Sequence, residues 1–135
     1  MEEDRPLEFW DRDDWQTIVT VWPPAVRKAI GASLRVLQHG EKPDSHCKAL
    51  RDFPIPLLEL WHRSGQRVIC TTEYANLTGR IHVLDAFEKD SGAGKKMRQS
   101  DKNRIERRAK ELKLRMDALK KPTERSQAAG KTKTH

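Results

Sequence analysis

The sequence predicts an α+β fold in which a helical hairpin precedes a small antiparallel sheet of three to four strands and a basic C-terminal helix. Apolar residues recur at helical spacing through the first 40 residues, and three short runs rich in β-branched and aliphatic residues follow. A narrow apolar stripe among many cations then appears after residue 100. The 135 residues of the chain suit one domain and a tail.

The first 40 residues are expected to form the helical hairpin. Trp15, Ile18 and Trp22 recur at helical spacing after Asp13 and Asp14, either of which can cap the helix start, and we expect both tryptophans to be buried. Two prolines then end this helix and open the next one, because proline is favoured at a first helical position. A glycine at position 40 is expected to stop the second helix. The apolar stripe of that helix consists of Val26, Ile30, Leu34 and Leu37.

The sheet is expected after a loop over residues 41–56, which contains three prolines and several charges. Residues 57–62, 66–72 and 80–87 are the strand-like runs. The connections between these runs are too short for helical crossovers, so an antiparallel meander is the economical arrangement. A further short strand can open near residues 8–10.

A basic loop over residues 88–98 leads to the last helix, which is expected to end at Pro122 because proline disrupts a helix interior. The apolar stripe of this helix consists of Ile105, Ala109, Leu112, Met116 and Leu119. We therefore expect a single domain over residues 1–120 and a flexible basic tail over residues 121–135.

Charge is distributed unevenly along the chain. Residues 1–60 carry 8 Lys and Arg against 11 Asp and Glu, whereas residues 61–135 carry 19 against 9, which gives net charges of −3 and +10. A basic half on a small protein favours a polyanion such as nucleic acid as the partner. No apolar run approaches the roughly 20 residues that span a bilayer, and the N-terminus lacks a signal-peptide pattern. We therefore expect a cytoplasmic protein with reduced cysteines.

Several local motifs, in order along the chain, resemble the phage-derived, HigB-like branch of the RelE/ParE toxin superfamily. They extend from roughly residue 8 to residue 115, and the ordered set is more specific than any single piece. The motifs are Trp22-Pro23-Pro24-Ala25-Val26-Arg27-Lys28-Ala29-Ile30-Gly31, Leu34-Arg35-Val36-Leu37-Gln38-His39-Gly40, Lys48-Ala49-Leu50, Leu58-Glu59-Leu60, Gln66-Arg67-Val68 and Val83-Leu84-Asp85-Ala86-Phe87-Glu88-Lys89.

The chain also departs from the family pattern at several positions. Asp85 stands where the family has its signature histidine, and Asp90 replaces the second lysine that follows the phenylalanine. Cys70 occupies a position that is commonly tyrosine, and Gln99-Ser100 replaces the Thr-Pro before the last helix. These differences cluster around the expected active face, so they bear on the chemistry more than on the fold.

The resemblance implies the toxin component of a type II toxin-antitoxin system, an endoribonuclease that cuts mRNA on the ribosome and blocks translation. Its partners would be a cognate helix-turn-helix antitoxin, mRNA and the ribosome. In such cleavage a ribose 2′-hydroxyl attacks the neighbouring phosphate, and Arg and Lys can match the negative charge that develops. We therefore expect no cofactor and no metal. The His46-Cys47 pair with Cys70 also lacks the spacing of a zinc site.

Four residues are candidates for this chemistry. Arg67, in the middle of a strand, can clamp a phosphate through its guanidinium, and Lys89, just beyond the third strand, can face the same groove. His82 and Asp85 are candidates for proton transfer, and His82, which alternates with apolar neighbours, is expected to face away from the core. The expected RNA-binding residues are Lys48, Arg51, Arg63, Lys95, Lys96 and Arg98.

A binding function on the same fold is the alternative. Asp85 and Asp90 add negative charge where a phosphate should bind. They favour a non-catalytic member that inhibits DNA gyrase by contact or acts as a phage-derived regulator. Arg67, Lys89 and the basic residues that follow them in the sequence favour the nuclease. New cuts inside translated messages would indicate the nuclease, whereas DNA damage would indicate the gyrase inhibitor.

Overall fold

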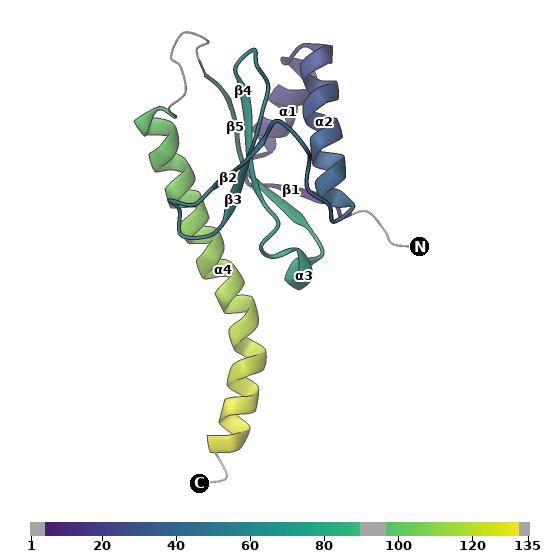
Figure 1. Ribbon diagram of the computed structural model, residues 1–135. Coiled ribbons are helices and arrows are strands. Elements are labelled where there is room, and N and C mark those ends of the chain that lie inside the picture. Colours follow the sequence, from purple (N-terminus) through teal and green to yellow (C-terminus); the bar gives the residue numbers. More distant parts are fainter. Residues whose placement is uncertain (1–4, 90–96, 133–135) are drawn as a thin grey trace.

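The computed structural model describes residues 5–89 and 97–132, with side chains up to residue 120, and it confirms the predicted α+β class (Figure 1). The helical hairpin comes first, the sheet follows, and a long helix ends the described chain. The elements are β1 (Leu7–Phe9), α1 (Arg12–Thr20), α2 (Pro24–Gln38), β2 (Cys47–Leu50), β3 (Leu57–Trp61), β4 (Gln66–Thr71), α3 (Ala75–Thr78), β5 (Ile81–Glu88) and α4 (Gln99–Thr132).

In the part of the chain that the structure describes, the sheet has five strands in the order β1-β5-β4-β3-β2, more than the three to four predicted. The predicted meander of β3, β4 and β5 is confirmed, and β1 pairs with β5 in the parallel sense. The prediction that residues 41–56 form only a loop is wrong, because β2 lies within them and pairs antiparallel with β3. Four residues are too few to show an alternating pattern, so this strand is defined by its pairing with β3.

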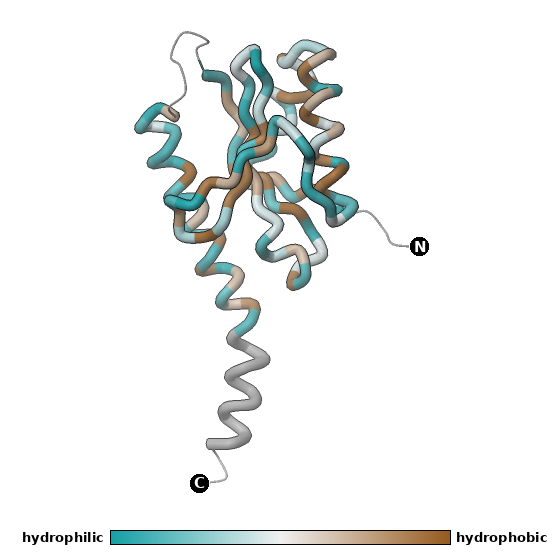
Figure 2. Tube along the Cα trace, viewed as in Figure 1, coloured by the Kyte–Doolittle hydropathy of each residue, from teal (hydrophilic) through white to brown (hydrophobic). Residues whose placement is uncertain are grey.

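Helices cover both faces of the sheet, with α1 and α2 on one side and α4 on the other (Figure 1). The tube coloured by hydropathy shows apolar segments where these layers meet (Figure 2). One core cluster joins the apolar residues of α1 and α2 to those of the sheet, including Leu60, Val68 and Val83. The second cluster joins Ile69 and Leu84 to the apolar stripe of α4. None of the helices in the described ranges combines the length and apolar character that crossing a bilayer requires.

The helical hairpin follows the predicted pattern, with two corrections. The cap of α1 is Asp11, whose carboxylate accepts a bond from the Asp13 backbone N–H at 2.9 Å, rather than Asp13 or Asp14. Trp22 is buried as expected, but Trp15 is 45% exposed, so its predicted place in the core is wrong. Trp15 packs against Phe9, with ring centroids 5.6 Å apart.

Helix α4 packs on the sheet through the predicted stripe over part of its length. Ile105, Ala109, Leu112 and Met116 are buried, whereas Leu119 is 55% exposed, so its predicted burial is wrong. The predicted end at Pro122 is also wrong, since the helix continues to Thr132. Figure 1 shows α4 extending beyond the sheet, where no strand faces it. The division into a domain over residues 1–120 and a tail stays a prediction.

A β-bulge in β5 controls which side chains face α4. Ile69 pairs with Asp85 but the next residue, Cys70, pairs with Val83, so Leu84 is an extra residue in β5. The extra residue shifts the alternation, and both Leu84 and Asp85 therefore lie on the α4 side. Without the bulge, Asp85 would share the face of Val83, which packs in the α1 and α2 cluster.

Candidate functional site

Three of the cations predicted from sequence meet on the α4 side of the sheet. Lys48 in β2 pairs in register with Glu59, and Arg67 in β4 pairs with Phe87, two residues before Lys89. Burial lowers the pKa of the Lys89 ammonium, and the positive charges of Arg67 and Lys48 lower it further, while the Glu59 carboxylate opposes them. Lys48, Arg67 and Lys89 are called the basic cluster below.

Glu59 lies at the centre of the basic cluster and was not singled out as a site residue from sequence. Its carboxylate oxygen Oε2 is 3.7 Å from Nε of Arg67. Only 7% of Glu59 is exposed, and Oε2 has no hydrogen-bond partner among the described residues. A buried carboxylate oxygen that accepts no hydrogen bond and lies next to cations can take a proton from a substrate. The sequence signal was one charged residue inside the otherwise apolar run of β3.

The Arg67 side chain is held in one orientation. Its Nη1 donates to the carbonyl oxygens of His62 and Gln66, both at 3.0 Å, and its guanidinium carbon lies 5.9 Å from the centre of the Trp61 ring. Its side chain is 15% exposed. A guanidinium held in this way needs little rearrangement to bind a phosphate oxygen.

The turn between β3 and β4 positions the backbone of Lys89. Gly65 adopts φ +114°, and its carbonyl oxygen accepts a hydrogen bond from the Lys89 N–H at 2.8 Å. A Cβ atom at Gly65 would lie 2.4 Å from the Lys89 carbonyl oxygen. A second bond, from Nε2 of Gln66 to Oε1 of Glu88 at 2.9 Å, joins the same two segments. The turn is therefore tied directly to the end of β5.

The carboxylate of Asp85 contacts arginines of α4 and not the residues of the basic cluster. Its Oδ2 is 2.8 Å from Nε and 2.7 Å from Nη2 of Arg104, and its Oδ1 is 3.5 Å from Nη1 of Arg108. The Ala86 N–H also donates to Oδ1 at 2.9 Å. Arg104 extends the network through Nη2 to Asp101 at 2.7 Å. These contacts occupy both carboxylate oxygens of Asp85.

Arg108 connects three elements around the bulge. Its Nη1 donates to the carbonyl oxygen of Leu84, the bulged residue, at 2.7 Å. It also lies 3.7 Å from Oδ2 of Asp14, and its Nη2 lies 3.8 Å from Oδ2 of Asp11. Burial, together with the negative charge of Asp85, raises the pKa of the Asp14 carboxyl to about 7, although Arg108 opposes both. Asp14, named from the sequence only as a possible helix cap, is therefore a second acidic group near Asp85 and Arg108.

His82 lies away from the basic cluster. It pairs with Thr71, while Arg67 pairs with Phe87, five residues further along β5, or about 16 Å at 3.3 Å per residue. It is 4% exposed and packs against the core residue Tyr74, so the prediction that it faces away from the core is wrong, although it does lie on the opposite face from Ile81 and Val83. The Tyr74 ring packs edge-on to the imidazole, and Nε2 lies 3.2 Å from Oγ1 of Thr78. Burial lowers the pKa of His82.

The other predicted RNA-binding residues that the structure describes are not part of the basic cluster. Arg51 and Arg63 are exposed on loops that flank β2 and β3. The Arg98 side chain is held by two hydrogen bonds: its Nε donates to Asp101 and its Nη2 donates to the Glu88 carbonyl oxygen, each at 3.0 Å. Lys95 and Lys96 lie outside the described residues, as does Asp90.

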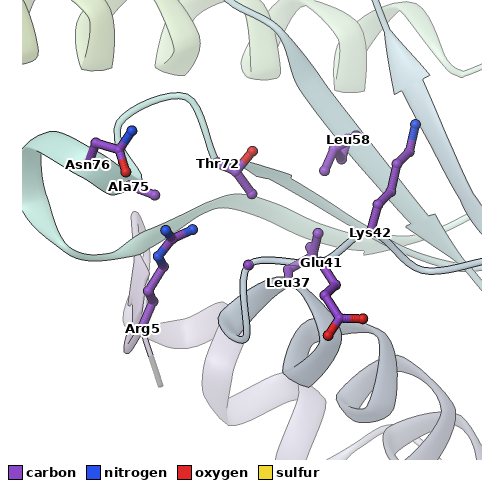
Figure 3. A pocket seen from close by; sticks show the side chains of 9 residues that line it. Arg5, Leu37, Glu41, Lys42, Leu58, Thr72, Ala75 and Asn76 are labelled. Atoms are coloured by element: carbon purple, nitrogen blue, oxygen red, sulfur yellow. The ribbon is translucent and has the colours of Figure 1, made fainter. Parts of the chain in front are cut away.

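A separate polar pocket of about 360 Å³ lies between the end of α2 and the segment before α3 (Figure 3). Its lining includes Arg5, Lys42, Thr72 and Asn76. None of the residues predicted as catalytic or RNA-binding lines it. Within the described ranges, no group of three or more His, Cys, Asp or Glu side chains is arranged to hold a metal ion.

Comparison with known protein families places the chain in a class of phage origin. Residues 19–110, about two thirds of the chain, match the model of the family described as phage derived protein Gp49-like (DUF891). The chain therefore belongs to the phage-derived Gp49-like family. The match includes β2 to β5 and the first part of α4, and so the basic cluster, Glu59 and Asp85, but not Asp14. No curated protein and no solved structure matches the chain.

Proposed function

We propose that this member of the Gp49-like family is a RelE/HigB-type toxin that cuts mRNA on the ribosome. Its partners are then a helix-turn-helix antitoxin, mRNA and the ribosome, and it acts in the cytoplasm. Family membership is consistent with such a toxin. The observation that carries the proposal is the convergence of Lys48, Arg67 and Lys89 around the buried carboxylate of Glu59. Three cations and one proton acceptor are the groups that metal-free cleavage of RNA needs.

In the proposed reaction the ribose 2′-oxygen bonds to the neighbouring phosphorus as the bond from phosphorus to O5′ breaks. Glu59 takes the proton of the 2′-hydroxyl, and the Lys89 ammonium gives a proton to the departing O5′. The products are a 2′,3′-cyclic phosphate and a 5′-hydroxyl. The lowered pKa of Lys89 makes its ammonium a stronger acid for this step. Arg67 binds the phosphate oxygens, and the exposed Lys48 guides the strand to them.

A non-catalytic function is the second candidate, and the contacts of Asp85 favour it. This residue stands at the signature histidine of the HigB-like toxins, and both of its oxygens are bound to α4 or to the backbone. The position therefore offers no group for proton transfer. A protein that keeps the basic cluster but lacks this group would bind a nucleic acid or inhibit DNA gyrase without cutting.

Induced expression in bacteria tests the proposal, with growth and mRNA 5′ ends followed together. The wild type should arrest growth and produce new 5′-hydroxyl ends inside translated messages, and Arg67→Ala should do neither. Lys28→Ala is the matched control, since Lys28 is an exposed cation on α2, which packs on the opposite face of the sheet from the basic cluster. Growth arrest without new ends, but with DNA damage, would contradict the nuclease and support gyrase inhibition. Absence of both effects would support the regulator.

A further inference from the structure

An apolar groove of about 240 Å³ lies between α1 and α2, on the side of the molecule opposite α4. Ile18, Val19 and Leu34 line it, together with Trp15. Trp15 is 45% exposed, whereas Trp22, just after the end of α1, is only 2% exposed. An exposed tryptophan beside an apolar groove is typical of a protein-binding surface.

Gly31 lines the same groove from the middle of α2. A glycine inside a helix costs about 1 kcal/mol relative to alanine, and the fold gives no compensating reason for it. No φ in the left-handed region is needed at Gly31, and a Cβ atom there would meet nothing within 4 Å. The missing side chain leaves an open notch in the floor of the groove. Such a notch allows the backbone of another molecule to approach α2 closely.

The charges in the groove are all of one sign. Arg27 and Arg35 are its only charged lining residues, and both come from α2. Nη1 of Arg27 donates to the Val19 carbonyl at 2.7 Å, but its buried Nε has no hydrogen-bond partner among the described residues. A buried donor without a partner is costly, and an acidic side chain entering the groove would satisfy it.

We infer that the groove between α1 and α2 binds an amphipathic helix of a partner protein, with an apolar stripe flanked by acidic residues. The stripe packs on Trp15 and the apolar floor, the helix backbone lies over Gly31, and its carboxylates pair with Arg27 and Arg35. This interaction does not depend on the proposed RNA cleavage, because the basic cluster lies on the other face of the sheet.

Peptide binding to the full chain, followed by ¹H–¹⁵N NMR spectra, tests the inference. The probe is a helical peptide of about 18 residues with a leucine stripe at helical spacing and glutamates on its flanks. Two further peptides serve as controls, one with lysine in place of every glutamate and one with the acidic sequence scrambled so that the stripe is lost. The acidic amphipathic peptide should shift the Trp15 indole and Gly31 amide signals and bind about tenfold more tightly than either control.

Gly31→Gln should abolish these shifts, because it fills the notch, while leaving the fold intact or more stable. Ala32→Gln is the matched control, since it adds the same side chain to the next exposed position of α2, which does not line the groove. Equal binding of the scrambled acidic peptide would overturn the inference, because simple attraction to the cations of α4 would then explain it. Unchanged binding to Gly31→Gln would also overturn it.

Discussion

Asp85 and Arg104 form a two-point contact between β5 and α4, with Oδ2 of the aspartate 2.8 Å from Nε and 2.7 Å from Nη2 of the arginine. Asp85 is 3% exposed, and the β-bulge at Leu84 turns it toward the helix. Asp85 thus binds the C-terminal helix to the sheet. Its contacts predict a structural role that can be measured apart from any activity.

Asp85→Ala should lower the free energy of unfolding by about 3 kcal/mol, because it leaves Arg104 and Arg108 partly buried without their shared carboxylate. Urea denaturation of the purified protein measures the loss. Arg104→Ala combined with Asp85→Ala should cost less than the two single changes added together, as expected for a direct pair. Additive losses would show that Arg104 and Asp85 do not stabilise each other.

The contribution of Asp14 to the free energy of unfolding should decrease as pH rises from about 4 to about 7. The folded pKa of Asp14 is about 7 and its ordinary value is 3.8, so between these values the folded state holds a proton that the unfolded state has released. Protonation therefore stabilises the fold below pH 7, and this stability is lost as pH rises through the folded pKa.

Asp14→Asn replaces the carboxylate with a neutral group of similar shape, so the variant should match the wild type near pH 4 and exceed its stability by a margin that grows up to about pH 7. Arg108 keeps its contacts with Asp85 and the Leu84 carbonyl in this variant. Urea denaturation at pH 4, 5, 6, 7 and 8 measures the difference. Parallel stability profiles for the two proteins would show that Asp14 titrates in the ordinary range.

Gly65→Ala should destabilise the fold by about 2 kcal/mol and displace Lys89. The left-handed φ of +114° disfavours any side chain, and the new Cβ would lie 2.4 Å from the Lys89 carbonyl oxygen. Gly79→Ala is the matched control, because Gly79 also has positive φ, +73°, but has open space around it. It should cost about 1 kcal/mol and leave RNA cleavage unchanged. Equal effects of the two changes would mean that contact with Lys89 is unimportant.

Glu59→Gln should reduce the rate of RNA cleavage by about 10²–10⁴-fold, because it removes the proposed proton acceptor while keeping the side-chain shape. RNA affinity should be unchanged or higher, since the change removes a negative charge from the basic cluster. Single-turnover cleavage on programmed ribosomes, with filter binding of the same message, separates the two effects. Loss of binding in parallel with cleavage would show that Glu59 acts only by holding Arg67.

The parts of the fold that could be predicted from sequence are those with a strong local signal. The stripe of α2 and the three central strands carry such a signal, and the structure confirms them. Strand β2 exists through its pairing with β3, and the exposure of Trp15 depends on how α1 sits on the sheet. Neither property belongs to a short window of sequence.

The candidate site was only partly predictable for the same reason. Arg67 and Lys89 were recognised as charged residues near strands, but the contribution of Glu59 depends on the register that places it between β2 and β4. Asp85 was expected near a phosphate, yet the bulge directs it to Arg104. A one-residue irregularity changes the face of every later side chain in the strand, and no sequence pattern marked it.

The bulge at Leu84 also makes misaligned pairing of β5 energetically unfavourable during folding. In a register without the extra residue, Asp85 would enter the apolar cluster beneath α1 and α2, and Arg104 and Arg108 would face the sheet without a carboxylate. A misaligned β5 would thus bury the unpaired negative charge of Asp85 under α1 and α2. It would also leave the positive charges of Arg104 and Arg108 without a partner on the α4 side. Docking of α4 therefore selects the one alignment of β5 that also carries Lys89 to the basic cluster.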